Sequence, residues 1–413
     1  MFMKLRILSI ILSLALITVF IASCNVVSPI DVRADTEIEA QGKNADSEFV
    51  SSMADFSSLL LNKVANKDEN TFISAYSVIS ALALVANGAD NNTKAQFEKV
   101  FGCDIDKLNS YLYSFNEKLQ SDEKVEVDIA NSVWVNEPKL SLYDEYLARV
   151  YAYYNSSVYR ENFATDDTLN KINKWCSDNT DGMIKEILKD LNPDAVMVLL
   201  NAIFFDAKWE KQYQSFNLTD GNFNNYDGSK SKASYLNSTE HNGFVGDNYT
   251  GAIKYYEGRK FAFAVLLPDE KTDVYDFAES ITGEKYLEIM NGATNKYDFS
   301  LKLPKLEIEF EQEIKDTLMS MGILDAFGGD ADFTKIGKPT SGKIFISKVT
   351  HKTKLELNEA GTRAAAVTSI EMRNTAFMPG EVIDVVLDRP FVFYIIDTET
   401  NVPIFSGIVN NLK

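Results

Sequence analysis

The chain has 413 residues, of which 45% are hydrophobic, and a formal net charge of −19 at pH 7. This length and apolar content are sufficient for a large buried core. The negative charge argues against a nucleic-acid partner, because neutralising phosphates requires clusters of Lys and Arg, and we interpret it as a soluble acidic surface. No linker rich in Pro, Gly or Ser divides the chain after residue 49, so we predict one large domain over residues 49–413.

The N-terminus has the pattern of a targeting segment. Lys4 and Arg6 precede a long apolar run that ends in Ile21-Ala22-Ser23-Cys24, which resembles the lipobox of bacterial lipoproteins. We therefore predict a signal peptide over residues 1–23 and lipid attachment to the thiol of Cys24. The alternative is an ordinary secretory signal that contains a cysteine by chance. The first interpretation predicts an extracellular lipoprotein that is anchored to the cell-surface membrane.

Residues 24–48 are polar and acidic, which predicts a flexible tether between the lipid and the folded domain. The other two cysteines, Cys103 and Cys176, do not make a disulfide framework in an exported chain of this size. The sequence leaves open whether they pair, and two buried free thiols are the simpler expectation.

Helical and strand patterns follow one another along the rest of the chain. Phe49, Met53, Phe56, Leu60 and Val64 recur at the spacing of an amphipathic helix. Segment 125–135 begins with clean alternation and is predicted as a strand. A nearly continuous apolar run predicts a strand buried on both faces at 196–205. Further strands are predicted at 261–268, 301–305 and 343–357. This mixture of elements predicts an α+β fold.

The stretch from Glu359 to Phe377 alternates in a different way. Every second residue from Thr362 to Met372 is small or apolar, whereas the positions between them carry all the charges. This is the pattern of a strand buried on one side, yet it lacks the bulky β-branched residues of an ordinary central strand. We interpret it as a segment that is a loop in one state and a sheet strand in another.

This stretch carries a resemblance to a known family. Glu359-Ala360-Gly361-Thr362, followed by Ala364, Ala365, Ala366 and Thr368, resembles the hinge of the reactive loop in inhibitory serpins, a family of serine protease inhibitors. Asp388-Arg389-Pro390-Phe391 and Phe405-Ser406-Gly407 resemble the strands that follow this loop. Similar motifs occur in the family's order over residues 49–413. Arg363 departs from the Glu that is usual at its position, and it lies on the outward face of the alternation.

The resemblance implies a fold and a set of site residues. The implied fold has about nine helices around a large five-stranded sheet, two smaller sheets and an exposed reactive loop. In serpins a polar cluster lies beneath the large sheet where the sheet opens, and the matching residues are Ser74, Ser77, Asn201 and His351. Trp209 and Glu359 match positions at the top of the sheet, where the loop enters. Core packing is the alternative role for Trp209, and a solvated strand end is the alternative for Glu359.

The resemblance also implies a reactive bond. Inhibitory serpins are usually cleaved after the fourteenth residue beyond the hinge glycine, which here gives the bond between Thr375 and Ala376. A Thr before the bond suits a protease of elastase or subtilisin type. Cleavage after Arg373, as by a trypsin-like enzyme, after Asn374, or after Phe377, as by a chymotrypsin-like enzyme, is the alternative.

The implied function is irreversible inhibition of serine endopeptidases, and also of cysteine proteases as a further class, by insertion of the cleaved loop 362–375 into the large sheet. The alternatives are a non-inhibitory serpin that proteases cleave as a substrate, and a surface-binding lipoprotein. We expect a monomer with no cofactor and no metal. A hydrolase is disfavoured, because the chain has no Gly-x-Ser-x-Gly motif and only two histidines, His241 and His351.

Overall fold

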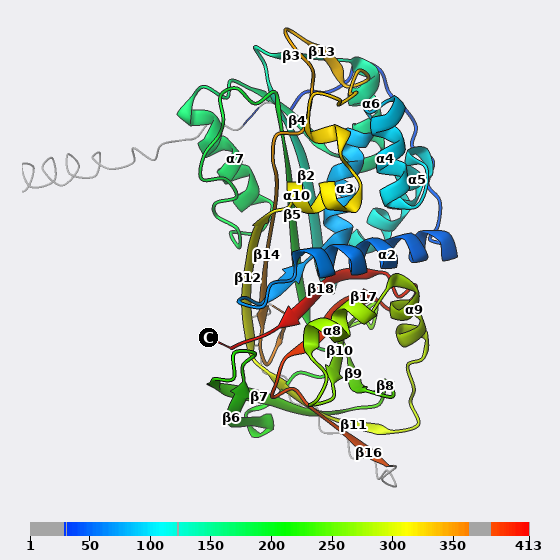
Figure 1. Ribbon diagram of the computed structural model, residues 1–413, viewed down its shortest axis with the longest axis vertical. Coiled ribbons are helices and arrows are strands. Elements are labelled where there is room, and N and C mark those ends of the chain that lie inside the picture. Colours follow the sequence, from blue (N-terminus) through cyan, green and yellow to red (C-terminus); the bar gives the residue numbers. More distant parts are fainter. Residues whose placement is uncertain (1–28, 30, 122–123, 363–380, 413) are drawn as a thin grey trace, which may run out of the picture.

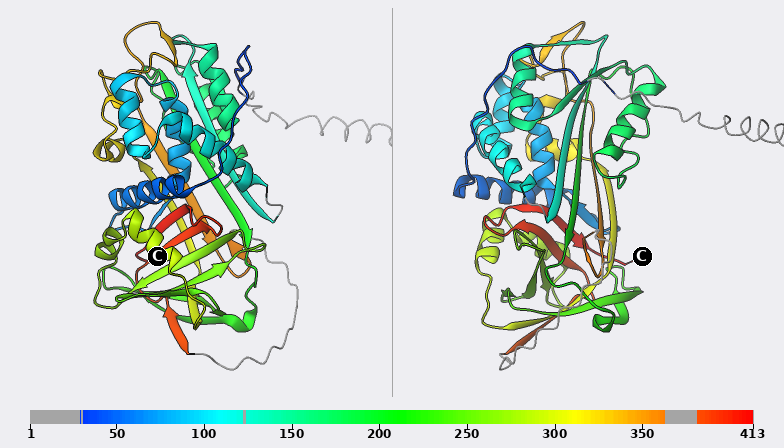
Figure 2. Two further views of the ribbon diagram at one scale, coloured as in Figure 1. Left: turned by 90° about the vertical axis from the view of Figure 1, so that its right-hand side faces the viewer. Right: turned by 180° about the vertical axis from the view of Figure 1, so that it is seen from behind.

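The fold is described here from a computed structural model, which describes residues 29, 31–121, 124–362 and 381–412 (Figure 1). The described part is elongated, and its large sheet runs along the long axis. Helix α7 (Asp166–Asp178) covers one face of this sheet. The helices near the N-terminus cover the opposite face, as the right-hand view of Figure 2 shows. The two other main sheets lie at one end of the molecule.

The described residues form nine α-helices, several of which begin at a polar residue that caps the first turn. The carboxylate of Asp46, for example, accepts hydrogen bonds from the amides of Glu48 and Phe49 at the start of α2. The helix predicted at residues 49–64 is confirmed as α2. The helices are α2 (Ser47–Val64), α3 (Ala75–Ala86), α4 (Asn91–Phe101), α5 (Ile105–Gln120), α6 (Asp144–Tyr154), α7, α8 (Val274–Ser280), α9 (Gly283–Asn291) and α10 (Lys315–Met321).

The large sheet has six strands, whereas the sequence predicted five. Their order is β12 (Leu306–Glu313), β14 (Val349–Leu357), β15 (Gly361–Thr362), β5 (Met197–Lys208), β2 (Val125–Asn136) and β4 (Ser157–Glu161). The additional strand is β15, which has only two residues and is the start of the predicted hinge. The physical reason for the difference is therefore that the first hinge residues already lie inside the sheet.

The remaining strands form three further sheets, where the sequence predicted two. A six-stranded sheet has the order β1 (Thr71–Ile73), β18 (Pro403–Val409), β17 (Phe391–Asp397), β10 (Phe261–Pro268), β9 (Tyr249–Tyr255) and β8 (Gly243–Val245). A four-stranded sheet has the order β16 (Val382–Val386), β11 (Asp298–Pro304), β7 (Lys230–Glu240) and β6 (Leu218–Asn224). The third is a small two-stranded pairing of β13 (Gly337–Pro339) with β3 (Leu140–Leu142).

The strand predicted at residues 343–357 is shorter than expected, because β14 begins only at Val349. Its neighbour β12 pairs with it up to Glu313, which lies opposite Thr350, and the chain then turns into α10 at Lys315. Residues 343–348 therefore have no strand of β12 beside them. An alternating pattern forms a strand only where a partner offers hydrogen bonds.

Part of the predicted tether lies against the folded domain. Backbone amides of this segment donate to three elements: Val32 to Val158 of β4, Asp35 to Asp144 of α6, and Lys43 to Ser110 of α5. These contacts fix residues 31–46 at three places, whereas the sequence predicted a flexible segment. Cys24 and the predicted signal peptide lie outside the described residues.

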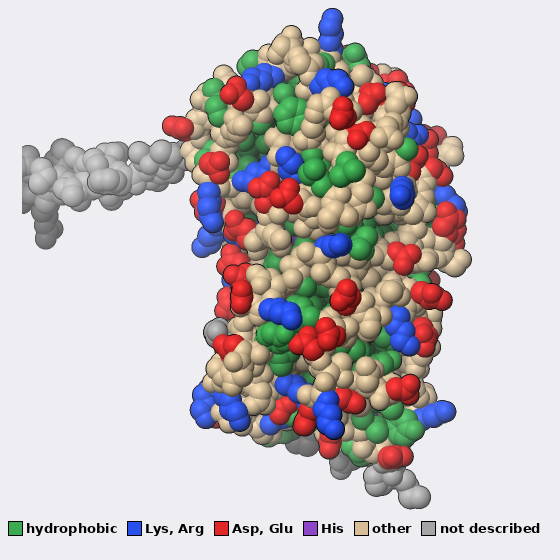
Figure 3. Space-filling model, in the orientation of Figure 1, with side chains coloured by type: hydrophobic (Ala, Val, Ile, Leu, Met, Phe, Trp, Pro, Cys, Tyr) green, Lys and Arg blue, Asp and Glu red, His purple; other side chains and the backbone are tan. Residues whose placement is uncertain are grey.

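The two cysteines of the described part lie in the core, and the charged side chains are spread over the surface. Cys103 and Cys176 are both buried and free, so the expectation of two separate thiols is confirmed. Acidic and basic side chains are interspersed over the face in Figure 3, with no single block of one sign. Of the helices in the described ranges, none is both long enough and apolar enough to cross a membrane.

Candidate functional site

The large sheet is open along part of the border between β14 and β5. These parallel strands pair directly where Val349–His351 lie beside Leu199–Asn201. At the other end of the border β15 lies between them, and Thr362 pairs antiparallel with Leu357 of β14 and with Ala207 of β5. Residues 352–356 pair on one side with β12, and residues 202–206 pair on one side with β2. Between these two segments, the pairings of the described residues place no strand. Such facing strand edges are a site at which a further strand can add.

A tight turn brings the chain from β14 back into the sheet. The side chain of Asn358 accepts hydrogen bonds from the amides of Ala360 (2.9 Å) and Gly361 (3.3 Å). The amide of Asn358 donates to the carbonyl of Gly361 over 3.0 Å. Asn side chains commonly stabilise turns in this way. A Cβ atom at Gly361 would lie 2.0 Å from the carbonyl oxygen of Ala207, so only glycine fits between the two strands here.

Aromatic side chains hold the first hinge residues. The amide of Trp209 donates to the carbonyl of Ala360 (2.9 Å), and its indole N–H donates to the carbonyl of Asn358 (3.0 Å). The Trp209 ring is buried and stacks on Tyr256, with centroids 4.5 Å apart. The hydroxyl of Tyr256 lies 2.6 Å from the hydroxyl of Thr362, and both residues are buried. Trp209 therefore both packs in the core and contacts the hinge.

Charged groups flank these aromatic rings. Glu359 forms an ion pair with Lys305, and its carbonyl accepts a hydrogen bond from the amide of Tyr213 (3.0 Å). The side chain of Lys254 is only 2% exposed, and its ammonium lies 2.9 Å from Glu240 and 4.4 Å from the centre of the Tyr213 ring. Burial lowers the pKa of Lys254, while the carboxylate of Glu240 opposes that effect. Glu359 is thus a paired group rather than a solvated strand end.

The predicted polar cluster lies beneath the sheet, where β14 and β5 pair. The hydroxyl of Ser74 accepts a hydrogen bond from the amide of Ser77 (3.1 Å) and donates to the carbonyl of Ile404 (2.8 Å). The amide of Ser74 donates to Nε2 of His351 (3.1 Å). All three cluster residues are buried. The backbone of Asn201 lies opposite His351 in the sheet, and its side chain is outside the described part.

His351 is a neutral hydrogen-bond acceptor. Because Nε2 accepts a hydrogen bond, the proton of the neutral ring lies on Nδ1. Burial lowers the pKa of His351 from 6.5 to about 4. Among the described residues, Nδ1 is buried and has no hydrogen-bond partner. The ring is therefore part of the packed support beneath the sheet.

The cluster and the hinge contacts are separate places along β5. Asn201 and Trp209 are eight residues apart, which corresponds to about 26 Å along a strand. The structure brings Ser74, Ser77 and His351 together, and it places Trp209 with Glu359, Gly361 and Thr362. The other predicted residues of the hinge and the reactive bond lie outside the described residues: Ala364, Ala365, Ala366, Thr368, Arg373, Asn374, Thr375, Ala376 and Phe377.

Several residues of the hinge site were not predicted. Asn358 has a recognisable signal, since Asn is typical of tight turns and it directly precedes the hinge. Tyr256 and Lys305 have none, because they reach the hinge from positions 106 and 57 residues earlier than Thr362 in the chain. Their position depends on how the sheets pack together.

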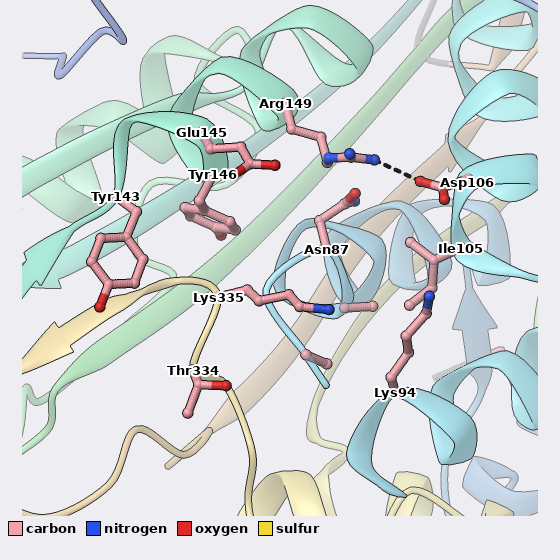
Figure 4. A pocket seen from close by; sticks show the side chains of 12 residues that line it. Asn87, Lys94, Ile105, Asp106, Tyr143, Glu145, Tyr146, Arg149, Thr334 and Lys335 are labelled. Atoms are coloured by element: carbon pink, nitrogen blue, oxygen red, sulfur yellow. Dashed lines mark hydrogen bonds and ion pairs between the residues drawn. The ribbon is translucent and has the colours of Figure 1, made fainter. Parts of the chain in front are cut away.

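The described residues offer no arrangement typical of a hydrolase. A cavity of about 410 Å³ lies between α3, α4, α5, α6 and the loop at Lys335, but no Ser, Cys or His lines it (Figure 4). At its rim, Arg149 pairs with Asp106 over 2.6 Å. His241 lies on the surface, where its Nδ1 is 2.8 Å from a carboxylate oxygen of Asp298. Neither the cavity nor the His241–Asp298 pair combines a nucleophilic side chain with a base that could activate it.

Comparison with known proteins gives consistent matches. The family described as Serpin (serine protease inhibitor) matches residues 51–412. Leukocyte elastase inhibitor A of Mus musculus is 31% identical over 355 residues, 82% of this chain and 92% of that protein. A serpin-like protein of Methanosarcina mazei is 30% identical over 369 residues, 86% of this chain and 84% of that protein. The crystal structure of the thermophilic serpin tengpin in the native state has a TM-score of 0.88 and 37% identity, and covers 94% of this chain and 100% of that one.

Proposed function

The chain belongs to the serpin family, and on this premise we propose that it is an irreversible inhibitor of serine endopeptidases that acts by inserting its cleaved loop into the large sheet. The observation that carries the proposal is the open border between β14 and β5, with β15 already in place at one end. A strand that follows Thr362 has facing hydrogen-bonding edges on both sides.

The proposed reaction begins as ordinary proteolysis. The nucleophilic oxygen of the protease attacks the carbonyl carbon of Thr375, and the bond between Thr375 and Ala376 breaks. The amine of Ala376 leaves with the proton that the protease's own base supplies, and Thr375 remains bound to the protease as an ester. Hydrolysis of this ester would release an active protease. Inhibition requires that insertion is faster than this hydrolysis.

The proposed trap is mechanical. Inserting residues 362–375 as a strand moves the tethered protease about 46 Å along the sheet, which distorts its active site. Ordering the loop costs conformational entropy at every residue, which offsets much of the gain from new hydrogen bonds. The main driving force is therefore strain in the uncleaved fold, which is a kinetically trapped state.

For the target we propose a protease of elastase or subtilisin type, and cysteine proteases as a further class. The Thr before the proposed bond fits a modest apolar pocket. The similarity to a protein named leukocyte elastase inhibitor A supports the same class. Cleavage after Arg373, Asn374 or Phe377 is the alternative and would indicate a different protease.

We further propose that the chain is exported and that Cys24 carries a lipid that holds it at the cell surface. The apolar N-terminal run and the motif that ends at Cys24 support this location. A Cys24→Ala variant should be lost from the membrane fraction. If Cys24→Ala and the wild type stay equally bound to membranes, the lipid anchor is wrong.

The test of inhibition mixes the form that begins at Asn25 with an elastase- and a subtilisin-type protease and separates the products on a denaturing gel. We expect a stable band at the summed mass and a released peptide that begins at Ala376. Cleaved chain together with fully active protease would identify a non-inhibitory, substrate-type serpin. A chain that neither protease cleaves would exclude these two enzymes as targets, and would leave a different protease or a surface-binding role.

A further inference from the structure

The strand pairings of β15 define where an inserted strand would lie. In an antiparallel pair of strands, the residue numbers of any two partners have the same sum. This sum is 719 for β15 with β14 (Thr362 with Leu357) and 569 for β15 with β5 (Thr362 with Ala207). If both antiparallel registers continue, Thr368 comes to lie between His351 and Asn201. In the present sheet His351 and Asn201 are direct partners. The two registers therefore agree, and β14 and β5 need only separate sideways, without sliding along each other.

In the same registers the next residue, Arg363, would lie between Glu356 of β14 and Asp206 of β5. Thr362 points inward, since it is buried against Tyr256. In a continued strand, residue 363 would point to the outer face, because side chains alternate. Glu356 and Asp206 lie on that outer face as well, because their neighbours Leu355, Leu357, Phe205 and Ala207 are buried. The chain leaves the described part directly at this point, after Thr362.

Glu356 and Asp206 belong to a longer row of acidic residues across the sheet. Glu307 of β12 is the register partner of Glu356, and Glu126 of β2 is the register partner of Asp206. We call Glu307, Glu356, Asp206 and Glu126 the acidic row. Lys354 already contacts one half of it, at 3.2 Å from Glu307 and 2.7 Å from Glu356. A residue that enters at position 363 completes the row at its centre.

We propose that the acidic row is the docking site for the guanidinium of Arg363, and that this pairing positions the first residues of the loop as they enter the sheet; this inference rests on the proposed function. Opposite charges on directly facing strand positions stabilise a sheet, and like charges destabilise it. An acidic residue at position 363 would place five carboxylates side by side. Arg also offers several donors to the two carboxylates that flank it.

A second charged position follows the same register. Glu371 would lie opposite Lys348, the residue directly before β14, which pairs with Asp190 over 3.9 Å. Ala365 would lie opposite Lys354. On the outer face of the border, the acidic residues would thus face the basic residue of the loop, and the basic Lys348 would face its acidic residue.

The experiment compares two acidic substitutions in the loop, two residues apart, in the form that begins at Asn25. Arg363→Glu faces the acidic row, whereas the matched control Ala365→Glu faces Lys354. We expect Arg363→Glu to slow loop insertion about tenfold at low salt, so that more chains are cleaved for each protease trapped. Ala365→Glu should stay close to the wild type. Raising the salt to about 1 M, where the Debye length is about 3 Å, should remove the difference.

Rescue separates this charge effect from a general loss of folding. Adding Glu356→Gln and Asp206→Asn to Arg363→Glu should restore the trapping ratio, and the uncleaved variants should unfold at temperatures close to that of the wild type. Equal behaviour of the two loop variants, or no rescue, overturns the inference.

A second measurement keeps this result distinct from the proposed function. The loop is cleaved by a protease that is not trapped, and the unfolding temperature of the cleaved chain is measured. A wild type that traps no protease but gains heat resistance on cleavage refutes inhibition, and the same variants then test the acidic row by this temperature. A wild type that gains none on cleavage refutes both.

Discussion

At the scale of single residues, the hinge depends on one buried hydroxyl pair. The hydroxyls of Tyr256 and Thr362 lie 2.6 Å apart, and both residues are buried. Removing one partner leaves the other buried without a hydrogen bond, which costs about 1–3 kcal/mol. The main contribution of the pair to stability is therefore that neither buried hydroxyl is left without a hydrogen bond.

We predict that Tyr256→Phe lowers the unfolding temperature of the uncleaved chain, because the hydroxyl of Thr362 loses its partner. Thr362→Val alone should have a similar effect. The double variant should be more stable than the sum of the two losses predicts, since no polar group is then left over. Strictly additive losses in thermal melts would show that the two hydroxyls do not interact.

A second residue-scale prediction concerns pH. The pKa of His351 is lowered from 6.5 to about 4 by burial, so the unfolded chain binds a proton that the folded chain excludes between these values. The contribution of neutral His351 to the free energy of unfolding is fully present above pH 6.5. It is lost as the pH falls toward 4, by about 3 kcal/mol in total. Unfolding temperatures of the wild type and His351→Gln at pH 7.5 and 5 should show a smaller pH dependence in the variant. Equal dependence would assign the loss to other groups.

At the scale of elements, the sequence predicted the existence of strands better than their limits. Segment 261–268 is confirmed as β10 with the same limits, because its apolar run is flanked by strands on both sides. Residues 343–348 were wrongly included in β14, since periodicity cannot show that a neighbouring strand has ended. The two residues of β15 were predicted as hinge but not as strand, because their conformation depends on the gap between β14 and β5.

The border between these two elements offers a direct test of sheet opening. Val349 and Leu199 are partners across it, so Val349→Cys with Leu199→Cys should form a disulfide that keeps β14 and β5 together. We predict that the oxidised form is cleaved by a target protease without trapping it. Reduction should restore trapping, which controls for damage by the substitutions. Trapping by the fully oxidised form would mean that the sheet does not open here.

At the scale of the whole molecule, the sequence predicted one domain and its family, but not how distant segments meet. The cluster of Ser74, Ser77 and His351 was predicted only through the family resemblance, because nothing local connects residues 277 positions apart. The contacts of residues 31–46 were missed for a similar reason. The polar, acidic composition of this segment predicts a flexible tether, because composition alone cannot show that the segment binds to the surface of the folded domain.

We predict that removing residues 25–45 lowers the unfolding temperature of the uncleaved chain. Three hydrogen bonds from backbone amides are lost, two to carbonyls of β4 and α5 and one to the Asp144 carboxylate of α6, at about 0.5–1.5 kcal/mol each. A truncation that ends at residue 30 keeps these contacts and is the matched control. Equal melting of the two truncated forms would show that the segment does not stabilise the fold.

The short turn at Asn358–Ala360 has a consequence for how this protein can change over generations. Its length fixes which face of the sheet each later residue meets, because side chains in a strand alternate. Point substitutions beyond Thr362 alter one contact at a time and leave the rest in place. The gain or loss of a single codon within the turn would instead move every charge of the loop toward the core at once. Point substitutions can therefore accumulate in the loop, whereas single-residue insertions or deletions in the turn should be eliminated.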